Sequence, residues 1–167
     1  KDDLPLFARV AMGEIEPDVD LPPMPPGEQV VEDYRHLKLS LRAHPVSFLR
    51  ADLDAQGIVR NDDLTRTPSG RRVTIAGAVL IRQRPGTAKG VIFVTLEDET
   101  GVANVVIWAK VYEKYRRAVI AGRLLRVTGR LQRQTGVVHV VADRIEDLSP
   151  LLDRLLQPDF RPELARA

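Results

Sequence analysis

The stretch that decides the fold is Arg71-Arg72-Val73-Thr74-Ile75-Ala76-Gly77-Ala78-Val79-Leu80-Ile81. Val73, Ile75, Val79 and Ile81 recur at every second position, and this period of two is typical of a β-strand. Gly77 stands in the middle of the run, where a residue without a side chain allows a strand to bend sharply. The sequence therefore predicts a long, bent first strand, ended by the turn Arg84-Pro85-Gly86-Thr87.

Four more strands and one helix follow this first strand. Lys89 to Glu97, Val102 to Ala109, Arg123 to Gln132 and Val137 to Ile145 have strand patterns, whereas residues 110–121 have helical spacing. The order of three strands, one helix and two strands is that of the five-stranded oligonucleotide-binding (OB) barrel, in which the helix closes one end. Gly129 is a second candidate for a bend. An SH3-like or other small barrel would lack a helix at this place.

The flanks of the barrel have other patterns. We expect an extended, proline-rich linker over residues 1–27, a helical hairpin and connector over 28–70, the barrel over 71–149, and a short helix with a tail over 150–167. The fold class is therefore mainly β with accessory helices.

The chain has no initiator methionine and no signal peptide, and we expect it to be a piece of a longer protein. No apolar run approaches the roughly 20 residues of a membrane span.

Charge is distributed unevenly along the chain. Residues 71–149 contain 14 Lys/Arg and 7 Asp/Glu, a net charge of +7, whereas residues 1–70 contain 8 basic and 13 acidic side chains, a net charge of −5. A basic half is typical of a module that meets a polyanion, although it is also compatible with an uneven solvated surface. The absence of cysteine fits a reducing cytoplasm.

Residues with catalytic or metal-binding patterns are not apparent. His36, His44 and His139 are scattered without metal-ligand spacing, and the acidic pairs lie at predicted helix ends or turns. No phosphate-binding glycine motif is present. We therefore expect no catalytic residue, no metal site and no cofactor within these residues.

Binding residues are predicted from the strand ends and faces. Two loops border the binding face of an OB barrel, and basic residues flank both: Arg82, Arg84 and Lys89 near the first, Arg130 and Arg133 before the second. On the strands, the alternation places Phe93, Asn104 and Trp108 on outward faces, where an aromatic ring can stack on a base and an amide can bond to a base edge. For Trp108 a place in the core is an equally good interpretation.

The run Gly90-Val91-Ile92-Phe93-Val94-Thr95-Leu96-Glu97-Asp98-Glu99-Thr100-Gly101 resembles the anticodon-type OB family, which has a Phe-x-x-Leu-x-Asp-x-x-Gly pattern across strands two and three. Carried over by position, Phe93 and Asn104 match binding-face sites of that motif. The flanking segments, including Ala43-His44-Pro45, resemble those before the barrel in bacterial C-family polymerases of the DNA polymerase III alpha-subunit type. The details are most similar to the error-prone, damage-tolerant branch of that family.

This resemblance implies a function for the parent protein. It would be a DNA-directed DNA polymerase used in translesion synthesis and damage-induced mutagenesis, with catalytic residues and Mg²⁺ outside these residues. The barrel would bind single-stranded DNA template. The implied partners are a Y-family-like accessory protein and a RecA-like accessory protein, in the nucleoid-associated cytoplasm of a bacterium. Two alternatives remain: an OB platform for protein docking without strong DNA binding, and a tRNA anticodon-binding module.

Overall fold

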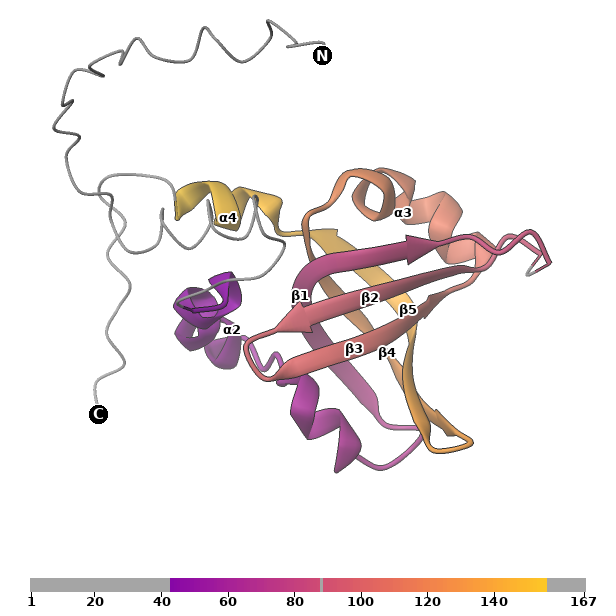
Figure 1. Ribbon diagram of the computed structural model, residues 1–167, viewed down its shortest axis with the longest axis horizontal. Helices are drawn as coiled ribbons and strands as arrows, with labels where there is room; N and C mark the ends of the chain where they lie inside the picture. Colours follow the sequence, from indigo (N-terminus) through magenta and orange to yellow (C-terminus); the bar gives the residue numbers. More distant parts are fainter. Residues whose placement is uncertain (1–42, 88, 156–167) are drawn as a thin grey trace, which may run out of the picture.

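The computed structural model describes residues 43–87 and 89–155, and in them five strands wrap into a closed barrel (Figure 1). The strands are β1 (Arg72–Gln83), β2 (Ile92–Asp98), β3 (Gly101–Ile107), β4 (Leu124–Gln134) and β5 (Val137–Asp147). Around the barrel they follow the order β1-β2-β3-β5-β4. The five-stranded barrel predicted from the sequence is thereby confirmed. The expected linker over residues 1–27 and the first part of the expected helical hairpin, residues 28–42, lie outside the described residues, and the proposed domain boundaries stay predictions.

Strand β1 is long because it pairs with two neighbours. Its first half pairs with β4 and its second half with β2, and Ala78 belongs to both ladders. A Cβ atom on Gly77 would lie 2.9 Å from the backbone oxygen of Glu97, so the close approach of β2 requires a glycine. The neighbouring backbone lies even closer to Gly129, which is at a β-bulge. A Cβ atom on Gly129 would lie 2.1 Å from the backbone oxygen of Val141.

The helix α3 (Ala109–Ala121) connects β3 to β4 and lies across one end of the barrel (Figure 1). It buries Tyr112 and Val119 in the main core, together with inward-facing residues of all five strands. Trp108, expected at the end of a strand, instead takes the N-cap position of this helix. The helix predicted after strand three is confirmed, one residue longer at its start.

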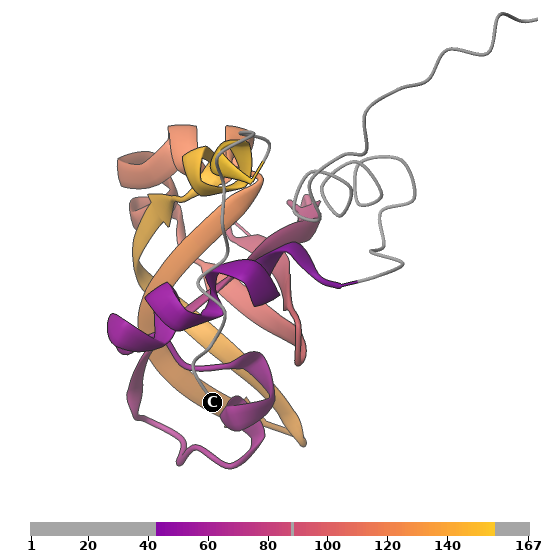
Figure 2. The same cartoon turned by 90° about the vertical axis from the view of Figure 1, so that its left-hand side faces the viewer.

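A second core covers the outer side of β1 and β4. The helical segments η2 (Pro45–Leu49), α2 (Arg50–Ala55) and α4 (Ser149–Arg154) contribute apolar side chains that pack against Ala76 and Leu124. Figure 2 shows η2 and α2 running across this side of the barrel. The period of two predicts one buried face for β1, but residues 75–78 are buried on both faces because these helices cover the outer one.

The start of the helical connector is fixed by polar contacts. His44 accepts a hydrogen bond from the backbone N–H of Val46 through its Nδ1, 3.2 Å away, and so caps η2. The connector continues through an isolated bridge between Val59 and Ile75 into η3 (Asn61–Thr65) before it enters β1.

Asp98 joins the connector to the barrel. Its side chain is fully buried and accepts hydrogen bonds from the backbone N–H groups of Asn61 (2.8 Å), Thr100 (2.8 Å) and Gly101 (3.1 Å). Arg50 on α2 donates to Asp98 over 3.2 Å and to Glu99 over 2.9 Å. One carboxylate therefore holds the β2–β3 turn closed and anchors two segments that precede the barrel.

We expect Asp98→Ala to lower the free energy of unfolding by about 3–5 kcal/mol, because it leaves the backbone N–H groups of Asn61, Thr100 and Gly101 without their acceptor and removes one carboxylate partner of Arg50. Urea denaturation followed by circular dichroism measures this change. The control is Asp54→Ala, which removes an exposed carboxylate 3.5 Å from Arg50 and should cost about 0–1 kcal/mol. Equal losses for the two variants would contradict the anchoring role of Asp98.

Candidate nucleic-acid interface

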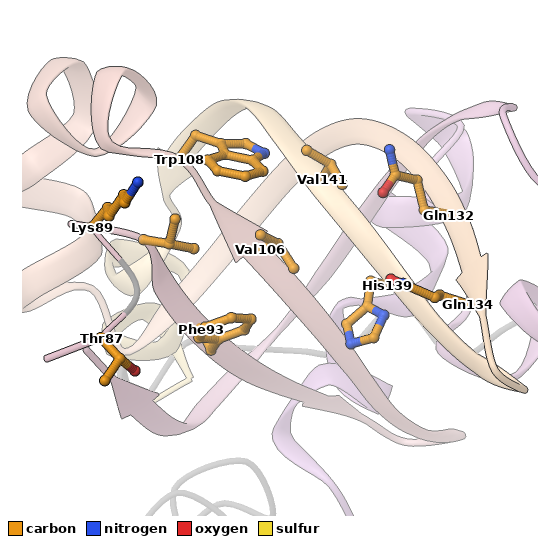
Figure 3. A pocket seen from close by; sticks show the side chains of 10 residues that line it. Thr87, Lys89, Phe93, Val106, Trp108, Gln132, Gln134, His139 and Val141 are labelled. Atoms are coloured by element: carbon orange, nitrogen blue, oxygen red, sulfur yellow. The ribbon is translucent and has the colours of Figure 1, made fainter. Parts of the chain in front are cut away.

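A groove of about 450 Å³ opens on the outer face of the barrel (Figure 3). Strands β2 and β3 form one side of it, and the β4–β5 hairpin forms the other. The loop between β1 and β2 borders one end. The residues that line the groove are Thr87, Lys89, Val91, Phe93, Val106, Trp108, Gln132, Gln134, His139 and Val141.

Two aromatic side chains lie on this groove. Phe93 is 37% exposed and Trp108 is 56% exposed, and Val106 lies between them in Figure 3. The alternation along β2 explains Phe93, since its neighbours Ile92 and Val94 face the core. Trp108 is exposed because the chain leaves β3 there and turns into α3. Of the two predicted places for Trp108, the core and the outer face, the structure therefore shows the outer face.

Polar side chains of the β4–β5 hairpin line the opposite side. Gln132 and Gln134 alternate on β4, and His139 faces them from β5, where it pairs in register with Gln132. These groups offer hydrogen-bond donors and acceptors to a ligand. Asn104 pairs with His139 across the β3–β5 junction and is half-buried, but it is not one of the residues that line the groove.

Lys89 and Arg130 are the predicted cations that lie at the groove. Lys89 lines it directly. Arg130 is exposed on β4 and pairs in register with Val141, which lines the groove. Among the described residues no carboxylate forms an ion pair with either cation. Both charges are therefore available to an anionic ligand.

The other predicted arginines point elsewhere. Arg82 donates from Nε to the backbone oxygen of Val119 over 2.6 Å and from Nη2 to that of Gly122, so it satisfies carbonyls at the end of α3. Burial lowers the pKa of Arg82, and the nearby Asp147 partly opposes this effect. Arg133 donates to the backbone oxygens of Thr65 (2.8 Å) and Thr67 (3.2 Å). The structure does not bring either guanidinium into the groove.

Arg84 lies in the loop between β1 and β2, outside the groove lining. Its guanidinium carbon is 5.5 Å from the centroid of the Tyr112 ring on α3. The predicted residues therefore fall into three groups. Phe93, Trp108 and Lys89 line the groove. Arg130 and Asn104 pair in register with residues that line it, and Arg82, Arg84 and Arg133 face α3 or the connector.

Several residues of the groove were not predicted as binding residues, in particular His139, Gln132, Gln134 and Thr87. The alternation along β4 places Gln132 and Gln134 on one face. The pairing of β4 with β5 across their turn could therefore have predicted both residues. His139 pairs with Gln132 in the same hairpin, so the same pairing places it on that face. The parallel pairing of β5 with β3, which brings this face beside Phe93 and Val106, has no local signal.

Over the described ranges 43–87 and 89–155, no cluster of three or more His, Asp or Glu side chains has a geometry that could hold a metal ion. In the same ranges no helix has the length and apolar character to span a membrane.

The comparison with protein families defines the class of this barrel. Residues 73–148 match the family described as OB-fold nucleic acid binding domain. This match agrees with the closed five-stranded barrel and with the helix between β3 and β4. The described barrel therefore has the OB fold, and its sequence is similar to this anticodon-type family, as its motif predicts.

Relatives with close sequence similarity are error-prone DNA polymerases. The chain is 58% identical over 154 residues to error-prone DNA polymerase 1 of Rhizobium meliloti (strain 1021), which covers 91% of this chain and 14% of that protein. It is 57% identical over 157 residues to error-prone DNA polymerase of Ruegeria pomeroyi, covering 93% and 14%. The predicted resemblance to the error-prone branch is confirmed. The chain spans about 14% of the length of these relatives.

Solved structures with a similar chain include asparaginyl-tRNA synthetase from Pyrococcus horikoshii complexed with asparaginyl-adenylate. The similarity has a TM-score of 0.47 and 24% sequence identity, and it covers 55% of this chain and 22% of that one.

We expect Arg82→Ala to lower the free energy of unfolding by about 1–2 kcal/mol, because it removes charged hydrogen bonds to partly buried carbonyls. Denaturant unfolding measures the loss. Gln83→Ala, which removes the neighbouring exposed side chain of β1, should stay within about 0.5 kcal/mol of the parent chain. An unchanged stability of the Arg82 variant would show that the contacts with Val119 and Gly122 are not structural.

Proposed function

We propose that the groove binds single-stranded DNA, as a template-handling surface of an error-prone DNA polymerase. The observation that supports this proposal best is the joint placement of Phe93 and Trp108 on one groove, with Lys89 and Arg130 beside them. Stacking surfaces and free cations are the two components that proteins combine to bind single strands.

The chemistry of the groove favours a single strand over a duplex. Base faces become accessible to Phe93 and Trp108 only when the bases are not stacked in a helix. The phosphates of a flexible strand can approach Lys89 and Arg130, and each contact releases condensed counterions. Gln132, Gln134 and His139 add hydrogen bonds whose geometry is adaptable. The expected ligand is therefore single-stranded DNA with little sequence preference.

The similarity to error-prone DNA polymerases extends the proposal to the parent protein. We propose that it synthesises DNA on a DNA template in translesion synthesis and damage-induced mutagenesis, with Mg²⁺ and the catalytic carboxylates outside the residues described above. The proposed partners are a Y-family-like and a RecA-like accessory protein, and the proposed place is the nucleoid-associated cytoplasm of a bacterium. The relatives' name supports the activity.

A second candidate function is protein docking on the same face. Half of the ten residues that line the groove are apolar: Val91, Phe93, Val106, Trp108 and Val141. Such a surface could bind an apolar segment of an accessory protein. A tRNA ligand has less support, because the relatives reported above are named as DNA polymerases.

We expect Phe93→Ala and Trp108→Ala each to weaken binding of a labelled oligothymidylate by about 1–3 kcal/mol, since each removes one stacking surface. Fluorescence anisotropy at constant salt measures the dissociation constant. Ile120→Ala serves as the control, because it removes a similarly exposed apolar side chain of α3 that does not line the groove. Wild-type affinity in both aromatic variants would refute the stacking assignment and favour protein docking.

We expect oligothymidylate binding to weaken with salt, with a slope of log K against log salt of about −0.7 for each phosphate contact. Lys89→Ala and Arg130→Ala should each make this slope shallower by about 0.7, because each removes one such contact. Titrations at several potassium chloride concentrations provide the slopes. Arg123→Ala, which removes an arginine paired with Asp153, should keep the parental slope. Affinity that does not change with salt would exclude the electrostatic mechanism.

A further inference from the structure

The pairing of cations with carboxylates differs between parts of the described chain. Seven arginines form ion pairs with carboxylates: Arg50, Arg60, Arg66, Arg72, Arg123, Arg126 and Arg144. None of these seven lies on α3 or in the loop between β1 and β2. The cations of α3 and of that loop have no carboxylate partner among the described residues: Arg84, Lys89, Lys110, Lys114, Arg116 and Arg117. The α3 helix and this loop therefore form a part of the surface in which no described cation is neutralised by a carboxylate.

Helix α3 is the centre of this surface. It has four basic side chains, all exposed, and its only carboxylate, Glu113, forms no ion pair in the described residues. Lys110 and Lys114 are four residues apart and share one face of the helix. Arg116 and Arg117 follow a kink at Tyr115, where φ is −114° and ψ is 23°.

Two guanidinium groups converge on Tyr112. Arg84 reaches the ring from the loop, with its guanidinium carbon 5.5 Å from the centroid, and Arg116 reaches it from α3 at 6.0 Å. Tyr112 itself is buried in the main core, so the ring gives both arginines a fixed platform. Two positive charges beside one ring, with no carboxylate paired to either among the described residues, favour an anionic ligand. A phosphate group fits this requirement, because guanidinium groups bind phosphate oxygens well.

This surface is continuous with the groove. Trp108 lines the groove and is also the N-cap residue of α3, and Lys89 belongs to the same loop as Arg84. In Figure 1 the loop between β1 and β2 projects beside the start of α3. Tyr112, which both arginines approach, lies one helical turn beyond Trp108.

We infer that Arg84 and Arg116 form a phosphate clamp that extends the single-strand binding site from the groove onto α3. This inference rests on the proposed function of the groove. Stacking at Phe93 and Trp108 would hold the bases of the first nucleotides. The clamp, followed by Lys110 and Lys114, would bind only the backbone of the nucleotides beyond them. The α3 surface thus contributes affinity that depends on the length of the strand and not on its bases.

The length of the oligonucleotide tests the clamp in the full 167-residue chain. Oligothymidylates of about five and about fifteen residues lie near the two ends of the usual site size of an OB-fold. We expect Arg116→Ala to weaken binding of the longer strand about fivefold at 0.1 M salt, and to make its salt slope shallower by about 0.7. Binding of the shorter strand should not change. Arg116→Lys should keep the slope, because it keeps the charge.

Two further results separate the clamp from the groove. Arg60→Ala removes an exposed, ion-paired arginine of the connector and should leave both affinities as they are. A wild-type chain that binds both strands equally well, or an Arg116→Ala variant that weakens both equally, would overturn the clamp while the groove proposal stands. A wild-type chain that binds neither strand would refute the proposed function, and the clamp with it. Thermal unfolding of each variant shows whether the barrel is intact.

Discussion

The groove depends on a short parallel pairing between two strands that are far apart in the sequence. Asn104, Val105 and Val106 of β3 pair with His139, Val140 and Val141 of β5, and this junction closes the barrel. All other ladders of the barrel are antiparallel. Without this junction the barrel would be an open sheet, and the two sides of the groove would not face each other. The central valines of both segments are buried, so apolar burial stabilises the closure.

The sequence motif shared with anticodon-type OB domains has four positions with four different tasks. Phe93 faces the groove, and Leu96 lies in the core. Asp98 accepts the hydrogen bonds that close the turn to β3, and Gly101 is one of the residues that donate to it. Only one of the four motif residues therefore belongs to the candidate interface. The motif defines the fold more strongly than it defines the ligand.

Local patterns predicted the elements of the barrel because the period of two and the helical period are local properties. They failed where backbone conformation or distant partners decide. Strand β2 was predicted to begin at Lys89, but Lys89 and Gly90 have positive φ angles of 46° and 83°, which end the extended conformation before Ile92. Arg82 and Arg133 have strand-end positions typical of binding residues, yet carbonyls remote in the sequence engage their guanidinium groups. The β3–β5 pairing that brings His139 beside β3 has no local signal in the sequence.

Trp108 is the only tryptophan of the 167-residue chain, and it lies where the groove meets α3. Its indole is more than half exposed. The tryptophan emission of this chain, excited selectively over that of its three tyrosines, therefore originates from a single position at the candidate interface. A base or an apolar side chain that covers the indole would change the wavelength and intensity of this emission. The native chain thus contains its own optical reporter of occupancy, and ligands can be compared without a chemical label on either partner.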